Sequence, residues 1–448
     1  MNNNVKLDKK TYPETLLVHG LSHDGRGIAT CDQKTVFING ALPGETVRYR
    51  IHQKHPTYDE ATTLEIVTPA SARTVPPCEH FGLCGGCSLQ HMQIETQIAL
   101  KQQTLLDQLK HFGKVTPQTI LPPLSSQSVG YRRKARLGVK FVIKKDKLLI
   151  GFREKNSNKL ADLSRCAVLH PAIGEKFQVL AELVRSLVIY QHIPQIEVAM
   201  GDETLALVFR HLEPLAQSDK EKLIAFGNTH NIHIYVQPNS PLPVTQLWPE
   251  SAPQRLCYHL PDQQLELLFH PLDFTQINLE MNRLMVNQAL TLLAITPEEN
   301  ALDLFSGIGN FSLSMARHAL HVTGIEGSEE MTQRATDNAR HNGMTNATFY
   351  AANLAQPPTS APWMQVKYDK VLLDPPRVGA KEILPYLGQC KPKRIVYVSC
   401  NPATLARDAG ELVTVYGYQL TAAGVMNMFP HTAHIEAIAV FENKNTDY

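Results

Sequence analysis

The sequence predicts an α/β protein in which the last third of the chain forms a mostly parallel sheet and the first part forms a small β-barrel. Two observations support this prediction. In residues 300–441, apolar strand-like runs alternate with helical runs, and several strands end in polar residues. In residues 15–73, short strand-like segments follow one another closely, with turn residues between them. The first pattern is typical of open α/β sheets and the second of small barrels.

Length and composition indicate a globular protein. The 448 residues should form two or three domains, and a hydrophobic fraction of 43% suits domains with substantial cores. No apolar run reaches the roughly 18 residues that a transmembrane helix needs. The first ten residues are polar and lack the apolar core of a signal peptide. We therefore expect a cytoplasmic protein that does not span a membrane.

The N-terminal segment should contain five strands, at 16–21, 27–30, 35–38, 46–52 and 61–67. Its pattern G-L-S-H-D-G-R-G-I-A, followed by V-F-I-N-G-A-L-P-G-E-T-V, resembles a TRAM domain, an OB-like module that binds RNA. A small barrel without a ligand is the alternative interpretation.

Four cysteines have a spacing typical of a metal centre. Cys78, Cys84 and Cys87 lie close together, and Cys166 lies far downstream. The two glycines between Cys84 and Cys87 let the backbone wrap tightly around a ligand. Four thiolates can hold a [4Fe–4S] cluster or a zinc ion. Zinc more often has two separated CxxC pairs, and this chain has one, so the cluster is favoured over zinc or no metal.

A basic segment follows the first three cysteines. Residues 130–160 contain eleven Lys and Arg against Asp146 and Glu154, which gives a local charge of +9. Two strands, 137–143 and 147–152, should form a hairpin in this segment. Such strands suit contacts with RNA phosphates, and a solvated charged face is the alternative. The expected RNA contacts are Arg132, Arg133, Lys134 and Arg136.

A glycine turn follows the expected strand 300–305. It carries Gly307 and Gly309 but lacks the third glycine of a nicotinamide-dinucleotide fingerprint. A second strand, 321–325, ends in Glu326, and an acidic residue there can bind two ribose hydroxyls. S-adenosylmethionine has a ribose and no phosphate, so this turn favours that cofactor.

The remaining elements continue the alternation of strands and helices. Asn353, Asp374 and Cys400 each stand where an expected strand ends. The last two strands should pair antiparallel at the edge of the sheet. The expected helices are 312–319, 329–342 and 402–416, and the expected strands are 347–352, 370–373, 394–398, 418–428 and 434–441.

Cys400 is the candidate nucleophile of the chain. It ends an apolar strand, and Pro402 suits the first turn of the next helix. The thiol should therefore face a helix N-terminus at the carboxyl end of a strand, where open α/β sheets bind ligands. We expect this position to lower the pKa of Cys400 and favour the thiolate. A buried cysteine that packs as a small hydrophobe is the alternative.

Five segments together resemble the RNA uracil-C5-methyltransferases, over nearly the whole chain. They are F-T-Q-I-N at 274–278, D-L-F-S-G-I-G-N-F at 303–311, D-P-P-R at 374–377, S-C-N-P at 399–402 and F-P-H-T-x-H-I-E at 429–436. The cysteines and the TRAM-like start resemble the RumA/RlmD type, which methylates 23S ribosomal RNA, at uracil 1939, and carries a [4Fe–4S] cluster. One departure is Asn427, where relatives often have Asp.

The resemblance implies a class I S-adenosylmethionine-dependent methyltransferase with a Rossmann-like seven-stranded sheet, an OB-like TRAM barrel and a central α+β iron–sulfur domain. The implied ranges are 13–73 for the TRAM domain, 74–97 with 129–270 for the central domain, and 98–128 with 271–448 for the catalytic domain. The implied cluster ligands are Cys78, Cys84, Cys87 and Cys166. The implied S-adenosylmethionine contacts are Gln276, Phe305, Asn310, Glu326, Asn353 and Asp374. The implied partner is 23S ribosomal RNA, with no obligate protein partner.

The implied reaction explains the other residue types. A thiolate that adds to C6 of uracil makes C5 nucleophilic toward a sulfonium methyl group, and the C5 proton must then leave. Cys400 is the expected nucleophile and Glu436 the expected base, with a surface carboxylate as the alternative for Glu436. Phe274 is expected to stack where the target base leaves its RNA stack, or else to pack in the core.

Other functions stay open at this point. The alternative targets are a tRNA uracil and another atom, such as an exocyclic amine, whose methylation needs no covalent nucleophile. A non-catalytic RNA chaperone would use the barrel and the basic hairpin alone.

Overall fold

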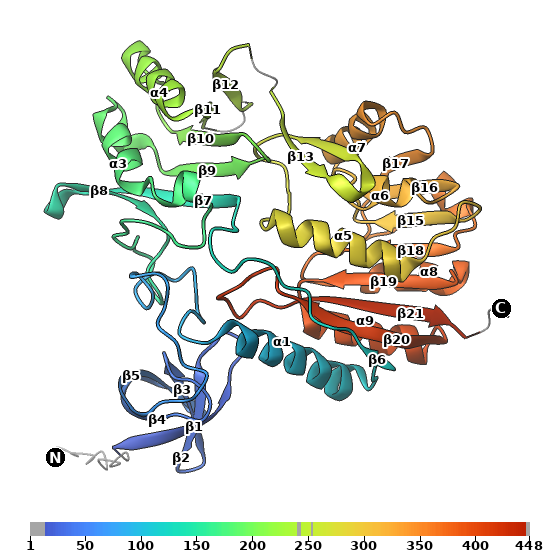
Figure 1. The fold of residues 1–448 in the computed structure, drawn as a ribbon, viewed down its shortest axis with the longest axis horizontal. Helices are drawn as coiled ribbons and strands as arrows, with labels where there is room; N and C mark the ends of the chain where they lie inside the picture. The colour runs from blue at the N-terminus through green and yellow to red at the C-terminus, as the bar shows by residue number, and fades with distance from the viewer. Residues whose placement is uncertain (1–13, 240–242, 252–253, 445–448) are drawn as a thin grey trace, which may run out of the picture. The chain divides into compact units, whose positions relative to one another are not determined.

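The computed structural model describes residues 14–239, 243–251 and 254–444 (Figure 1). The first ten residues, for which we expected no signal peptide, lie outside these ranges. So do residue 13 of the predicted TRAM domain and residues 445–448 of the predicted catalytic domain. The described chain divides into two compact units. Residues 14–97 and 431–434 form unit 1, and residues 98–430 with 435–444 form unit 2.

Unit 1 contains the predicted barrel. Five strands close in the order β1-β2-β3-β5-β4. Alternating side chains such as Val36 and Ile38 fill its interior, as the period of two in a strand requires. Beside the barrel, Glu45 is buried and its carboxylate accepts hydrogen bonds from Arg73 and from the Leu42 amide. The strands are β1 (Thr15–Leu21), β2 (Gly27–Cys31), β3 (Lys34–Asn39), β4 (Thr46–Lys54) and β5 (Tyr58–Thr68).

The last third of the chain forms the core of the predicted α/β sheet in unit 2. The order is β17-β16-β15-β18-β19-β21-β20-β6, and the strands lie side by side in this order in Figure 1. The first five are parallel, and β21 is antiparallel to both neighbours. The strands are β6 (Thr119–Ile120), β15 (Asn300–Leu304), β16 (His321–Glu326), β17 (Ala347–Ala351), β18 (Lys370–Leu373), β19 (Arg394–Ser399), β20 (Tyr418–Met426) and β21 (Glu436–Asn443).

The seven strands expected from the sequence are all present in this sheet, but one edge of the sheet differs from the expectation. The sheet has eight strands, because β6 pairs parallel with β20 through Thr119 and Ile120. The predicted antiparallel pair β20–β21 is present, with β6 rather than β20 at the edge. Strand β21 begins at Glu436, so the expected base stands at the very start of a buried strand.

Helices cover both faces of this sheet and bury two apolar clusters. One cluster includes side chains of α5 (Leu279–Leu293), α6 (Ser312–Ala316) and α7 (Glu329–His341). The other includes side chains of α1 (Ile94–Gln108), α8 (Leu384–Cys390) and α9 (Pro402–Thr414). The predicted helix 312–319 is shorter, since α6 ends at Ala316. Short helical turns are η1 (Leu109–Gly113), η2 (Ile143–Lys145), η3 (Tyr190–His192), η4 (Pro261–Gln263), η5 (Pro362–Gln365) and η6 (Lys381–Ile383).

The central part of unit 2 has a second sheet, in the order β12-β11-β10-β9-β7-β8, and a separate hairpin, β13–β14. The predicted basic hairpin is the antiparallel pair β7–β8. In the described ranges, no helix is long and apolar enough to cross a membrane. The elements are β7 (Lys134–Val142), β8 (Lys147–Gly151), α2 (Pro171–Gly174), α3 (Phe177–Ser186), β9 (Gln195–Met200), β10 (Leu205–His211), α4 (Gln217–His230), β11 (Ile232–Pro238), β12 (Thr245–Trp248), β13 (Leu256–Leu260) and β14 (Leu265–Phe269).

Candidate active site

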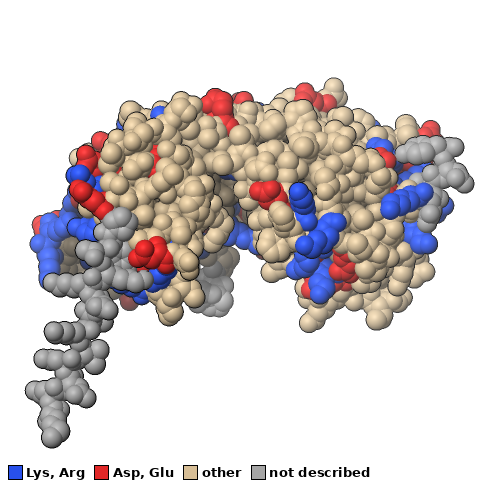
Figure 2. All heavy atoms as spheres, turned by 90° about the horizontal axis from the view of Figure 1, so that it is seen from below, with Lys and Arg blue, Asp and Glu red and all other residues tan. Residues whose placement is uncertain are grey.

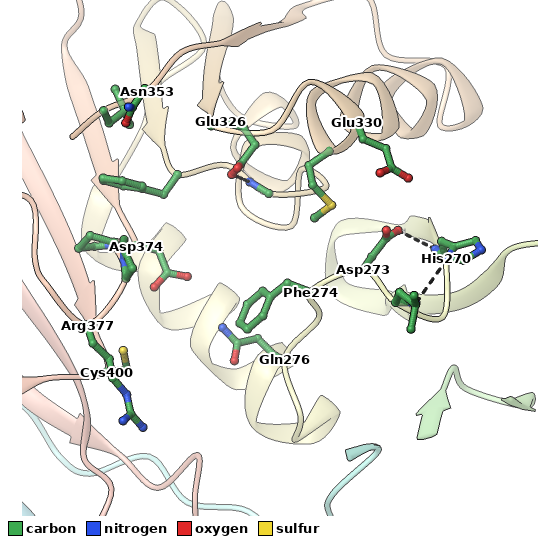
Figure 3. Close-up of a pocket in the computed structure, with 18 of the residues that line it drawn as sticks. His270, Asp273, Phe274, Gln276, Glu326, Glu330, Asn353, Asp374, Arg377 and Cys400 are labelled. Carbon is green, nitrogen blue, oxygen red and sulfur yellow. Dashed lines mark hydrogen bonds between the residues drawn. The ribbon is translucent and has the colours of Figure 1, made fainter. Parts of the chain in front are cut away.

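A cavity of about 1140 Å³ opens at the carboxyl ends of the parallel strands (Figure 3). This is where an open α/β sheet binds ligands. Asp374 and Cys400 reach it from the strand ends, and Phe274 and Gln276 reach it from the segment before α5. The predicted site residues that line the cavity are Phe274, Gln276, Phe305, Glu326, Asn353, Asp374, Cys400 and Glu436.

The glycine turn and Glu326 form one connected wall. The Gly307 amide donates to Glu326 Oε2 over 3.0 Å, and the Ser328 amide donates to Oε1 over 3.1 Å. Phe305 has a φ of 70°, in the left-handed region that is uncommon for an aromatic residue. Its amide and that of Ser306 both donate to the Ile325 carbonyl, which holds this turn beside β16. Such local strain is typical of functional sites.

Asn310 is the one predicted cofactor residue that does not line the cavity within the described chain. Its Oδ1 accepts hydrogen bonds from the Tyr258 hydroxyl and from Asn282 Nδ2, both over 2.9 Å. Its own Nδ2 donates to Asn282 Oδ1 over 3.0 Å. This placement supports a role for Asn310 in holding the glycine turn rather than in direct contact with a ligand.

Cys400 lies on a tightly bonded turn between β19 and α9. The Asn401 side chain caps α9 by accepting from the Ala403 amide over 3.1 Å, which satisfies a helix N-terminal donor. Asn401 Nδ2 and the Thr404 hydroxyl both donate to the Arg377 carbonyl. These bonds join the S-C-N-P turn to the D-P-P-R loop, so Cys400 and Asp374 are held on neighbouring strand ends.

Two carboxylates of this cavity, Glu436 and Asp374, are held in a setting that favours their protonated forms. Burial and then repulsion from Asp374 raise the pKa of Glu436 well above its usual range, although Arg377 acts in the opposite direction. Burial raises the pKa of Asp374 to about 7. Burial likewise raises the pKa of Asp303, behind the glycine turn, to about 7. Only 3% of Glu436 is exposed, so the alternative of a surface carboxylate is wrong.

The expectation that the pKa of Cys400 is lowered is also wrong for this structure. Burial raises the pKa of this thiol to about 11, and the carboxylates of Glu436 and Asp374 add to the effect. Arg377 opposes it. Burial and the two nearby acidic groups therefore outweigh the helix N-terminus. Arg377 also lines the cavity, and sequence analysis gave this residue of the D-P-P-R motif no role.

The segment before α5 is anchored from the basic hairpin. Lys134 Nζ donates to the carbonyls of Pro271 and Asp273, and burial lowers the pKa of Lys134 to about 8. Asp273 is followed by Phe274, which is 69% exposed. The alternative that Phe274 packs in the core is therefore wrong, and its ring is available to a ligand in the cavity.

The four predicted RNA contacts have different surroundings. Arg133 Nη1 donates to the Gly201 carbonyl, and Lys134 is held as described above. Arg132 Nε donates to the Lys134 carbonyl over 3.0 Å. Arg136 pairs with Glu197 at 2.7 Å, yet its side chain is 71% exposed. On the face that Figure 2 shows, Lys and Arg side chains lie in several separate groups with acidic side chains beside them.

Comparisons with known proteins agree with this geometry. A methyltransferase domain model matches residues 295–408, and a TRAM domain model matches residues 14–64. The chain is 50% identical, over 97% of its length and 98% of the relative, to the 23S rRNA (uracil(1939)-C(5))-methyltransferase RlmD of Alkalilimnicola ehrlichii. It is 51% identical to the protein of that name from Nitrosococcus oceani, over 96% of each chain.

This chain belongs to the RlmD family. Its fold is also similar to a crystal structure of the Pyrococcus abyssi tRNA (uracil-54, C5)-methyltransferase in complex with S-adenosyl-L-homocysteine. The TM-score is 0.74 at 24% identity, over 96% of this chain and 99% of the other. This likeness establishes the class I methyltransferase fold, and RlmD membership rests on the closer relatives.

Asn427 lies just before the terminal F-P-H-T motif. Its Oδ1 accepts from Lys101 Nζ over 2.9 Å, and the same ammonium donates to the Phe429 carbonyl over 3.0 Å. Burial lowers the pKa of Lys101 to about 7. Sequence analysis missed Lys101, because its partners Asn427 and Phe429 are distant in the chain. This contact holds the end of β20 beside the cavity that Phe429 lines.

Three of the four predicted cluster ligands lie in unit 1. Cys78 is buried and its amide donates to Gln90 Oε1 over 3.1 Å. The Gly86 amide points at Cys84 Sγ over 3.4 Å, a contact that also suits a ligated sulfur. Burial and the nearby Cys78 raise the pKa of Cys84. Cys166 lies in unit 2, where its amide donates to the Gly174 carbonyl. The cluster therefore stays a prediction, supported here by the proximity of Cys78 and Cys84.

Proposed function

We propose that this protein transfers a methyl group from S-adenosylmethionine to C5 of the uridine at position 1939 of 23S ribosomal RNA. The observation that carries the proposal is the meeting of a thiol and a buried carboxylate, Cys400 and Glu436, in one cavity of an RlmD-family chain. Methylation of an exocyclic amine needs neither group, and a non-catalytic chaperone needs no such cavity.

S-adenosylmethionine is proposed to occupy the part of the cavity between the glycine turn and Asp374. When bound, it supplies an electrophilic methyl group on a sulfonium sulfur. Glu326 would accept the ribose hydroxyls, since its carboxylate is already fixed by two backbone amides. Gln276, Phe305, Asn353 and Asp374 complete the proposed contacts, and Asn310 would support the turn through Tyr258 and Asn282.

Cys400 is proposed to add to C6 of the target uracil. The Sγ–C6 bond forms, and the electron pair of the C5–C6 double bond moves to C5 and the adjoining carbonyl oxygen. C5 then forms a bond to the methyl carbon, whose bond to the sulfonium sulfur breaks and leaves its electron pair on that sulfur. The raised pKa of Cys400 means that the thiolate must be formed within the complex, and Arg377, which lowers this pKa, is placed to favour it.

Glu436 is proposed to complete the reaction as the base. Its carboxylate takes the C5 proton, the electron pair re-forms the double bond, and the Sγ–C6 bond breaks to release the Cys400 thiolate. Burial beside Asp374 makes the ionised carboxylate a strong proton acceptor, so Glu436 must be in its ionised form when the methylated adduct is reached. The two residues stand at the ends of strands β19 and β21, which pair directly.

RNA is proposed to reach the cavity past Phe274 and the basic hairpin. Extrusion of a base costs a few kcal/mol of stacking, which the exposed Phe274 ring would partly restore. Among the predicted basic contacts, Arg136 is the most available to a phosphate. Arg132, Arg133 and Lys134 would add positive charge while they hold protein carbonyls.

A [4Fe–4S] cluster bound by Cys78, Cys84, Cys87 and Cys166 is part of the proposal. It is supported by the thiol spacing and by the loop around Cys84. Anaerobically purified protein should be brown and contain about four irons per chain. Stoichiometric zinc without iron would exclude the cluster. The proposed domains are the TRAM barrel 13–73, the cluster domain 74–97 with 129–270, and the catalytic domain 98–128 with 271–448.

Mapping of 5-methyluridine in cellular RNA tests the proposed substrate. In a strain that lacks this protein, mass spectrometry of 23S rRNA fragments should show unmodified uridine at 1939, and the purified protein with S-adenosylmethionine should restore the methyl group. The Cys400→Ala protein is the matched control and should not restore it. Loss of methylation in tRNA, with position 1939 still modified, would overturn the substrate assignment.

A further inference from the structure

The outer face of hairpin β13–β14 carries a cluster of side chains that the proposed reaction does not use. Cys257 and His259 are two residues apart on β13 and so lie on one face, while Tyr258 between them is buried on the other. Glu266 stands directly opposite His259 in the antiparallel register. A thiol, an imidazole and a carboxylate therefore share one small patch of the hairpin.

The potential ligand atoms of these three residues lie close enough to bind one ion. All are within 4.8 Å of one another. Cys257 Sγ is 3.1 Å from Glu266 Oε1, and His259 Nε2 is 4.0 Å from the same oxygen. Separations of this size are compatible with a shared metal after small side-chain adjustments, since zinc bonds are about 2.0 to 2.3 Å long.

Asp202 fixes the tautomer of His259. Asp202 Oδ2 accepts from His259 Nδ1 over 2.8 Å and from the His259 amide over 2.7 Å. Arg283 Nη2 holds the same carboxylate at 2.8 Å. With Nδ1 donating, the lone pair of neutral His259 is on Nε2, the atom that faces Glu266. A carboxylate behind a ligating imidazole is the usual outer shell of a zinc histidine.

Glu266 is oriented from the other side by α7. His341 Nε2 lies 2.9 Å from Glu266 Oε2, which leaves Oε1 on the side of Cys257 and His259. A hollow of about 430 Å³ opens here, and His259, Glu266 and His341 line it. Three ligands beside a hollow leave room for a water as the fourth ligand, which is a common zinc geometry.

We propose that Cys257, His259 and Glu266 form a binding site for a divalent transition-metal ion of the zinc class, with Asp202 and His341 as outer-shell partners. A sulfur, a nitrogen and an oxygen ligand together suit zinc and do not suit magnesium or calcium. On binding, the Cys257 thiol loses its proton to solvent, and the hydrogen bond from Sγ to Glu266 is replaced by two bonds to the ion.

A metal ion at this site would hold strands β13 and β14 together close to the glycine turn. Tyr258, between the two ligands on β13, donates to Asn310 of that turn. An ion that joins β13 to β14 therefore restrains the residue that holds Asn310. The proposed metal is structural in this sense and takes no part in methyl transfer.

Residue-specific alkylation tests this proposal in the anaerobically purified full-length protein. Cys257 should react with iodoacetamide at least about tenfold more slowly when Zn²⁺ is present, and Mg²⁺ should have no effect. Peptide mass spectrometry reports each thiol separately, so zinc bound at the four cluster cysteines does not confuse the result. Cys390, another half-buried thiol, is the internal control and should react equally with and without Zn²⁺.

Variants of the exposed ligands sharpen the test without threatening the fold. His259→Ala should abolish zinc protection of Cys257, and His341→Ala should weaken the apparent zinc affinity by about 10- to 100-fold. Equal alkylation of Cys257 with and without Zn²⁺ would overturn the proposal, as would full protection in His259→Ala. Neither outcome bears on methylation, which is measured independently.

Discussion

The cavity and the basic hairpin contrast in how their charged groups are compensated. Glu436 and Asp374 are acidic neighbours whose pKa values are raised, so their ionised forms are costly. In the hairpin, Arg133 and Lys134 donate to backbone carbonyls and Arg136 pairs with Glu197. A buried charge without a partner costs free energy, and such groups mark sites of catalysis. The paired charges of the hairpin instead stabilise the fold.

The largest effect should come from Cys400. Cys400→Ala should reduce methylation by about 10⁴-fold or more, because covalent activation of C5 is lost. Single-turnover methyl transfer to a 23S rRNA fragment measures this. RNA affinity and S-adenosylmethionine affinity should both stay within about threefold of wild type. A variant that keeps substantial activity would show that the cavity works without a nucleophile.

Replacement of the base should separate activity from stability. Glu436→Gln should slow turnover by about 10²- to 10⁴-fold and accumulate a covalent complex with ordinary RNA, since the C5 proton has no acceptor. A denaturing gel shows the complex. Absence of any adduct, together with slow turnover, would assign Glu436 to an earlier step.

The same variant should be more stable than wild type in alkaline solution. The folded pKa of Glu436 is raised, so the folded protein retains a proton that the unfolded chain releases above a pH of about 4. The free energy of unfolding of wild type should therefore fall as pH rises, and this loss should be smaller in Glu436→Gln. Thermal unfolding at pH 5 and pH 8 measures the difference. An equal advantage at both pH values would contradict ionisation as its cause.

A smaller effect is expected from Lys134. Lys134→Met should reduce the free energy of unfolding by about 1 to 3 kcal/mol, since two buried carbonyls lose their donor. It should also lower methylation through the displaced Phe274. Denaturant titration and methylation assays at saturating S-adenosylmethionine test both parts. Unchanged stability with weaker RNA binding would make Lys134 a phosphate contact, as its sequence first indicated.

Arg136→Ala should have the smallest effect. Its side chain is largely exposed, and its pair with Glu197 contributes little to stability. RNA affinity should fall modestly, and the dependence of log K on log salt should flatten by less than one unit. Filter binding over a salt series measures the slope. The Lys134→Met protein, compared at the same concentration of folded protein, is the matched control. An unchanged slope for Arg136→Ala would show that Arg136 does not contact RNA phosphates.

The sequence predicted those features that depend on neighbouring residues. The glycine turn, the polar strand ends and the helix start at Pro402 are local patterns, and their strands and helices form within a few residues of the expected positions. Strand β6 escaped prediction because two residues, Thr119 and Ile120, have no periodicity.

The features that sequence analysis missed depend on distant partners. The pKa of Cys400 is set partly by Glu436 and Asp374, which arrive from other strands. Lys134 donates to the carbonyls of Pro271 and Asp273, more than 130 positions away. The family resemblance implied that Asn310 contacts the cofactor. In this structure the Asn310 side chain accepts hydrogen bonds from Tyr258 and Asn282.

The most direct test of the central claim uses RNA with 5-fluorouridine at position 1939. Addition of Cys400 and methyl transfer can proceed, but Glu436 then finds no proton on C5 to remove. The account predicts a covalent protein–RNA complex that survives denaturation, requires S-adenosylmethionine, and yields a Cys400 peptide carrying the methylated fluorouridine. Cys400→Ala should form none. A complex joined through another residue, or a Cys400→Ala protein that still forms it, would contradict the account.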